Sequence, residues 1–143
     1  MEIERKFLLN SVPELDGYEV KEIEQAYLCR QPVMRIRRSN DKYIFTYKGG
    51  GMMAREEANL PLTKEAFDEL LPKTEGPIIK KKRYLIPYGS YTIELDYFES
   101  PNPGLYMAEV EFPTIEEAML FEKPDWFGEE VTDNPAYHNS NMK

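Results

Sequence analysis

Side chains alternate in character along most of this 143-residue chain, beginning with EIERKF at residues 2–7. A β-strand points successive side chains to opposite faces, so a period of two predicts strands rather than helices. The segments that show it cover residues 2–9, 20–30, 33–39, 41–48, 55–62, 78–87, 90–99 and 104–112. Most of the connections between them are short, which is typical of antiparallel neighbours.

Only two segments show helical spacing instead. Thr63 is placed to cap a helix over 63–71, and Thr114 with Glu117 forms a capping box ahead of a second helix that Pro124 ends. So many strands with so few helices favour a sheet that closes on itself, because closure removes exposed edges. We predict a mainly β (α+β) fold, a closed eight-stranded antiparallel β-barrel with a few short helices.

Length and charge narrow the class of protein. A chain of this size is expected to form one domain, 1–143, and the longest apolar run is far too short to cross a membrane. The net charge of −8 argues against nucleic-acid binding. The single cysteine, Cys29, forms no internal disulfide, and no signal peptide is evident, so a cytoplasmic protein is expected. A homodimer is an option that the sequence leaves open.

Acids and bases fall on separate strands. Same-face carboxylates occur as Glu2 with Glu4, Glu94 with Asp96, and Glu109 with Glu111. Same-face cations occur as Arg35 with Arg37, Lys81 with Arg83, and Lys48 with Lys42, while the segment 55–62 mixes Arg55 with Glu57. A solvated sheet face explains alternation on any single strand. A solvated face does not explain segregation by sign, because neighbouring like charges are destabilising unless a ligand of opposite charge binds to them.

The two sets of charge suggest a polyanion that is held together with a metal ion. Paired carboxylates suit a hard divalent cation such as Mg²⁺ or Mn²⁺, and clustered arginine and lysine suit phosphate. Phosphoryl transfer depends mostly on positioning and charge neutralisation of this kind. The charged faces are therefore expected to converge inside the barrel.

Several motifs follow one another in a fixed order: EIERKF at 2–7, QAYL at 25–28, RIR at 35–37, YKG at 47–49, KKRY at 81–84, ELD at 94–96, EVEF at 109–112 and WFGEEVT at 126–132. In this order and spacing they resemble the CYTH superfamily, the triphosphate tunnel metalloenzymes. The resemblance implies a barrel that forms a tunnel, binds a linear triphosphate with divalent metal and hydrolyses or rearranges it. Inorganic triphosphate is the substrate that the resemblance favours.

The resemblance also implies roles for individual residues. The implied metal ligands are Glu2, Glu4, Asp96, Glu109 and Glu111, with Mg²⁺ or Mn²⁺ as the ion. The implied triphosphate cradle is Lys6, Arg35, Arg37, Lys48, Lys81 and Arg83. Tyr27 with Lys48 resembles a pair that handles the proton in the superfamily, although a strand tyrosine more often serves packing.

Other interpretations stay open at this point. The same superfamily includes adenylate cyclases and nucleoside triphosphatases, and a module that binds polyphosphate or a nucleotide without turnover would share many of these residues. Asn59 stands where relatives commonly carry a glutamate, which keeps the binding module open. His138 lies in a polar tail without a clear period and is expected at the surface, and Met52 and Met53 are expected in a loop or at an edge.

Overall fold

The computed structural model describes residues 1–51 and 53–141, so Met52 lies outside the described residues. The strands are β1 (Glu2–Leu9), β2 (Glu19–Arg30), β3 (Val33–Ser39), β4 (Lys42–Lys48), β5 (Ala54–Arg55), β6 (Glu57–Leu62), β7 (Glu75–Tyr88), β8 (Tyr91–Ser100), β9 (Tyr106–Glu111) and β10 (Phe127–Glu130). The helices are α1 (Lys64–Leu70) and α2 (Ile115–Leu120), with short 3₁₀ turns η1 (Leu71–Lys73), η2 (Pro135–Tyr137) and η3 (Asn139–Asn141). No helix among these residues is long and apolar enough to cross a membrane.

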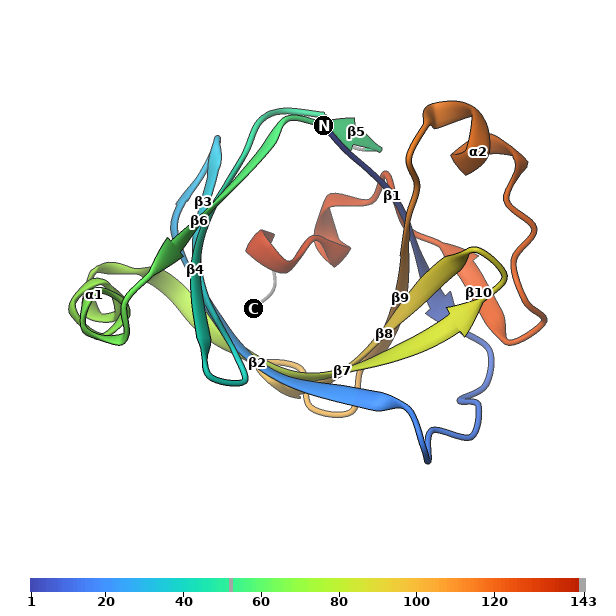
Figure 1. The fold of residues 1–143 in the computed structure, drawn as a ribbon, viewed down its shortest axis with the longest axis horizontal. Coiled ribbons are helices and arrows are strands. Elements are labelled where there is room, and N and C mark those ends of the chain that lie inside the picture. The colour runs from blue at the N-terminus through green and yellow to red at the C-terminus, as the bar shows by residue number, and fades with distance from the viewer. Residues whose placement is uncertain (52, 142–143) are drawn as a thin grey trace.

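The strands form a nearly closed antiparallel barrel (Figure 1). Neighbours follow the order β1-β9-β8-β7-β2-β3-β4-β6, and β5, just ahead of β6, pairs back onto β1. That last pairing consists of Glu2 opposite Arg55 and Ile3 opposite Ala54. If β5 and β6 are taken as one interrupted strand, the wall has the eight strands that the period of two predicts.

The two predicted helices form outside the wall. The Thr63 hydroxyl accepts from the Ala66 amide and the Thr114 hydroxyl accepts from the Glu117 amide, as their capping positions require. Glu117 does not complete a capping box, because its carboxylate accepts from the Tyr91 hydroxyl. β10 is an additional strand that sequence periodicity does not predict, and it pairs with the far half of β1.

Two of the three apolar clusters found among the described residues lie on the outer face of the barrel. One cluster gathers the outward side chains of β1, β8 and β9 with α2 and β10; its centre includes Phe7, whose ring lies 4.7 Å from that of Phe127. The other lies beneath α1, where Phe67 packs on Ile36 and Ala26. The apolar half of each alternating strand therefore faces outward, which leaves the polar half to line the interior.

The third apolar cluster fills one end of the interior. It contains Tyr27, Val33, Ile79, Phe98 and Met107, and Leu8, Leu105 and Tyr137 pack against it. Tyr137 belongs to the C-terminal segment, which turns back and enters the ring formed by the strands (Figure 1). The interior is thus apolar at one end and charged over the rest of its length.

Candidate functional site

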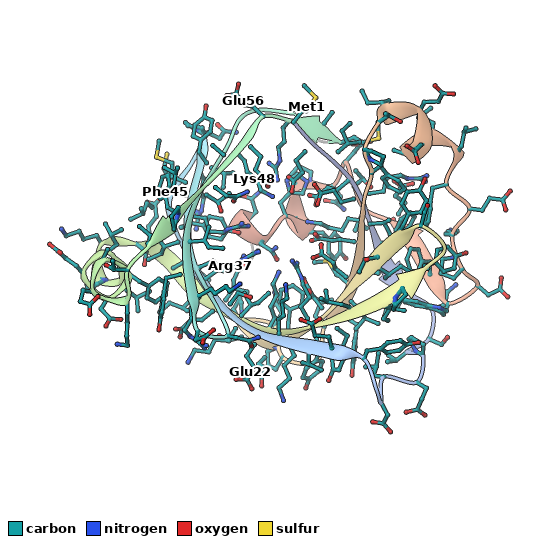
Figure 2. All side chains as sticks on the ribbon, in the orientation of Figure 1. Met1, Glu22, Arg37, Phe45, Lys48 and Glu56 are labelled. Carbon is teal, nitrogen blue, oxygen red and sulfur yellow. The ribbon has the colours of Figure 1, made fainter. Side chains whose placement is uncertain are left out.

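Inward side chains of the barrel enclose a charged cavity of about 250 Å³. Arg37 and Lys48 point into the ring, whereas Glu22, Phe45 and Glu56 lie on its outside (Figure 2). The charged residues that line the cavity are Glu2, Glu4, Lys6, Arg35, Arg37, Lys48, Arg55, Glu57, Arg83, Glu94, Glu109 and Glu111. The predicted convergence of the charged faces is observed.

The charges divide the wall into two arcs. The carboxylates come from β8, β9 and β1, which are neighbours in the sheet, and from β6, which follows β5 on the other side of β1. β7, β3 and β4 supply most of the cations. Between β7 and β3 lies β2, which contributes the neutral side chains Gln25 and Tyr27. Lys6 and Arg55 are the cations on the acidic side. A ligand in the cavity therefore meets mostly anions on one side and mostly cations on the other.

Three carboxylates of the acidic arc come close enough to share one cation. Oxygen atoms of Glu2, Glu57 and Glu111 lie within 4.8 Å of one another. Glu57 extends the predicted set, because the sequence showed it only as part of a strand of mixed sign. Clustered carboxylate oxygens are the donors that Mg²⁺ and Mn²⁺ prefer, so this group fits a hard divalent ion.

Burial and neighbouring carboxylates raise the pKa of two glutamates in the acidic arc. Burial first, and then the carboxylate of Glu109, raises the pKa of Glu4 to about 7. Burial and the carboxylates of Glu2 and Glu57 also raise the pKa of Glu111. In both glutamates burial contributes most and the neighbouring carboxylates add to it, so a positive charge placed among them would favour their ionised forms.

The two arginines of β3 that line the cavity, Arg35 and Arg37, form the part of the basic arc most available to an anion. Among the described residues, neither Arg35 nor Arg37 forms an ion pair; Arg35 donates to the Thr46 hydroxyl and Arg37 to the Gln25 amide oxygen. The buried Nε of Arg35 has no hydrogen-bond partner among these residues. Removal from water, then the charges of Arg35 and Arg83, lower the pKa of Arg37 to about 9. Guanidinium groups without a carboxylate partner are suited to bind an anion through paired hydrogen bonds.

Deeper charges are already paired with each other. Asp96 is almost completely buried and lies 2.8 Å from Lys81 Nζ, and it accepts two hydrogen bonds from Arg83. Glu109 lies 3.4 Å from Lys6 Nζ and 3.8 Å from Arg83. Although burial alone would raise it, these cations bring the pKa of Glu109 well below its usual range. The predicted metal-ligand roles of Asp96 and Glu109 and the predicted phosphate roles of Lys81, Arg83 and Lys6 stay predictions.

Lys48 and Tyr27 both line the cavity but have other partners. Lys48 Nζ lies 2.8 Å from Glu2 and 3.5 Å from Glu57, so it bridges two of the three clustered carboxylates. The Tyr27 hydroxyl accepts from the Gln25 amide nitrogen at 2.9 Å. The proton-handling role of this pair stays a prediction.

Asn59 connects the two arcs. Its amide oxygen accepts from the Thr46 hydroxyl at 2.7 Å, and its amide nitrogen donates to Glu57 at 3.2 Å. Burial raises the pKa of Glu57, but a hydrogen bond with Glu2, the charge of Lys48 and the hydrogen bond from Asn59 together lower it. A glutamate at this position would have no donor to offer Glu57 and would add a like charge. The asparagine therefore offers Glu57 a donor that favours its ionised form.

The expected surface position of His138 is wrong. His138 is half-buried and lines the cavity beside Asn139, because the C-terminal segment enters the barrel. Its Nε2 lies 3.1 Å from the Thr132 carbonyl oxygen. Burial, with Lys6 and Arg55 nearby, lowers its pKa. No period or motif in the tail indicates this placement, whereas the period of two already placed Glu57 and Glu94 on the charged faces that line the cavity.

Comparison with known proteins gives one consistent family. The sequence matches the CYTH domain over residues 1–138. It is 36% identical to the inorganic triphosphatase of Nitrosomonas europaea, over 96% of this chain and 93% of that protein, and 38% identical to the inorganic triphosphatase of Acetivibrio thermocellus, over 99% and 92%. A crystal structure of an inorganic triphosphatase superposes with a TM-score of 0.69 at 33% identity, covering 99% of this chain and 93% of that chain. With the barrel and its charged interior, these matches establish that the chain belongs to the CYTH domain family.

Proposed function

We propose that this protein hydrolyses inorganic triphosphate to pyrophosphate and phosphate with the help of a divalent metal ion. The observation that carries the proposal is the division of one cavity wall into an acidic and a basic arc. A linear triphosphate is a compact polyanion that the basic arc can bind directly and that the acidic arc can bind only through a metal ion. Both arcs would then bind the same substrate, the basic arc directly and the acidic arc through the metal ion.

The acidic group has the composition that such an ion requires. Glu2, Glu57 and Glu111 would hold it, with Glu4 close by in the same row of β1. A bound Mg²⁺ or Mn²⁺ supplies charge neutralisation at phosphate oxygens and an activated water. Lys48 already lies against Glu2 and Glu57, which places an ammonium group at the junction of metal ligands and substrate.

The basic arc would orient the phosphate chain. Arg35 and Arg37 offer guanidinium donors that no carboxylate among the described residues occupies, so binding a triphosphate breaks no ion pair there. Arginine meets phosphate oxygens through paired hydrogen bonds, which fixes orientation as well as charge. The remaining acids then face the opposite side of the same substrate. Orientation of this kind accounts for much of catalysis in phosphoryl transfer.

Support for the inorganic substrate comes from the relatives, since both curated proteins that cover the chain are inorganic triphosphatases. Nucleoside triphosphates carry the same phosphate tail, so the assay compares them directly. Phosphate release is measured from inorganic triphosphate, ATP and pyrophosphate, each with Mg²⁺, Mn²⁺ or a chelator, and the ATP reactions are analysed for cyclic nucleotide.

Fast release from inorganic triphosphate that the chelator stops would support the proposal. Preferred turnover of ATP would replace the substrate, and a cyclic product would indicate a cyclase. Tight triphosphate binding without turnover of any compound would indicate a binding module instead.

A further inference from the structure

Gln25 lies between a substrate-binding candidate and a catalytic candidate, and it is completely buried. Its amide oxygen accepts from Arg37 Nε at 2.9 Å, and its amide nitrogen donates to the Tyr27 hydroxyl at 2.9 Å. On the β2–β3 ladder Gln25 is directly opposite Arg37, and Tyr27 is directly opposite Arg35. The side-chain amide of Gln25 therefore connects Arg37 on β3 with Tyr27 on β2.

The direction of these hydrogen bonds follows from chemistry. Arginine only donates, so the group that faces Arg37 Nε has to be the amide oxygen. The amide nitrogen consequently faces Tyr27, and the tyrosine oxygen is the acceptor of that bond. The hydroxyl proton of Tyr27 is therefore left free for another acceptor, and Tyr27 lines the charged cavity.

The same contact also orients Arg37. Because Gln25 occupies Nε, the two terminal nitrogens of the guanidinium remain available to a ligand in the cavity. A free guanidinium on a long side chain would have to lose rotamer freedom when it bound a phosphate, at a cost in affinity. Because the hydrogen bond from Gln25 already orients Arg37, its side chain loses this rotamer freedom when the protein folds and not when the substrate binds.

We propose that Gln25 is a positioning residue for triphosphate hydrolysis: it directs the hydroxyl proton of Tyr27 toward a triphosphate oxygen and holds Arg37 for the same substrate. The inference rests on the proposed function and adds to it the residue that organises two of its groups. A buried amide that served packing alone would need neither neighbour in the cavity.

The decisive variant is Gln25→Glu. A carboxylate at this position still accepts from Arg37 Nε, but it cannot donate, so Tyr27 has to donate to it. The hydrogen bond to Tyr27 is reversed while volume and the contact with Arg37 are kept. We expect kcat for triphosphate to fall by about 10- to 100-fold, the effect of losing one hydrogen bond to a charged group, and KM to rise as well, because the new carboxylate forms an ion pair with Arg37.

Tyr27→Phe tests whether the loss passes through the tyrosine. This substitution alone should lower kcat by a similar factor, and Gln25→Glu in the Tyr27→Phe background should lower kcat no more than about twofold further. The matched controls are Gln31→Glu, in the exposed turn between β2 and β3, and Tyr97→Phe, which packs on Tyr106 at the outer face. Both should keep the activity of the unsubstituted protein.

Thermal unfolding is measured for every variant. If Gln25→Glu fails to fold, Gln25→Met replaces it: this change removes both hydrogen bonds, so kcat should fall and KM should rise, and only the KM effect should persist in the Tyr27→Phe background. Additive losses of kcat, or a Gln25→Glu protein as active as the unsubstituted one, would overturn this inference alone. An unsubstituted protein that hydrolyses no triphosphate would overturn the proposed function and this inference with it.

Discussion

Two groups of carboxylates in the same barrel differ in how completely nearby cations compensate their charge. The deep group is Asp96 and Glu109, which are buried and paired with cations; Asp96 has two of them at 2.8 Å. The other group, Glu2, Glu57 and Glu111, is called the mouth group because Glu111 is exposed to solvent; Glu2 and Glu57 share Lys48, and Glu111 forms no ion pair among the described residues. Both groups arise from the same alternation along a strand. A paired interior charge supports the fold, whereas an incompletely paired one remains available to a ligand.

The largest expected effect comes from removing a charge of the mouth group. Glu111→Gln takes away one of three clustered oxygens, and we expect metal-dependent release of phosphate to fall by about 1,000-fold or more, since metal ions contribute several kcal/mol in such reactions. The melting temperature should stay the same or rise, because a crowded negative charge is lost. Glu116→Gln, on exposed α2, is the control. Normal activity of Glu111→Gln would show that the metal assignment is wrong.

The deep group should respond in stability. Asp96→Asn leaves Lys81 buried without its counter-ion, and breaking a buried pair costs about 3–5 kcal/mol of unfolding free energy. Denaturant unfolding measures it. Asp68→Asn, which breaks the exposed pair with Lys64, should leave the unfolding curve nearly unchanged. If Asp96→Asn unfolded like the unsubstituted protein but lost its metal dependence, Asp96 would belong with the mouth group.

Arg37→Ala tests the basic arc. We expect triphosphate affinity, measured by calorimetry with Ca²⁺ in place of the activating metal, to weaken by about 10- to 100-fold, because a charge-assisted contact is lost. Arg38→Ala provides a close control, since Arg38 is the next residue along β3 and pairs with Glu24. Unchanged affinity of Arg37→Ala would contradict the cradle.

The smallest expected effect is at Asn59. Asn59→Ala removes one hydrogen bond to Glu57, so the metal concentration needed for half-maximal activity should rise by about 2- to 10-fold, with kcat at saturating metal little changed. Asn59→Asp, which keeps the contact with Thr46 but offers Glu57 no donor, should behave at least as badly. A gain in metal affinity in Asn59→Asp would mean that position 59 works better as an acid than as a donor.

The alternation of residues was sufficient to predict the barrel and the inward faces. Arg35 and Arg37 share one face of β3, and Glu109 and Glu111 share one face of β9, because side chains two residues apart in a strand point the same way. The segregation of these faces by sign then indicated that they line a common interior. The pairing of charges was not predictable in the same way: whether Asp96 meets a lysine or a metal depends on the register of β7 against β8, which no single strand records. His138 was mispredicted because the path of the C-terminal segment depends on tertiary packing through Tyr137.

The short contact between β1 and β5 has a consequence for how the molecule opens. Two residue pairs complete the ring, and Glu2, one of the four residues in that contact, also belongs to the carboxylate group near Glu57 and Glu111. Backbone amides at this seam should exchange with solvent sooner than those of the long β7–β8 ladder, because fewer bonds protect them. A cation shared by β1, β6 and β9 would fasten the seam from inside, so ligand loading would slow exchange there first.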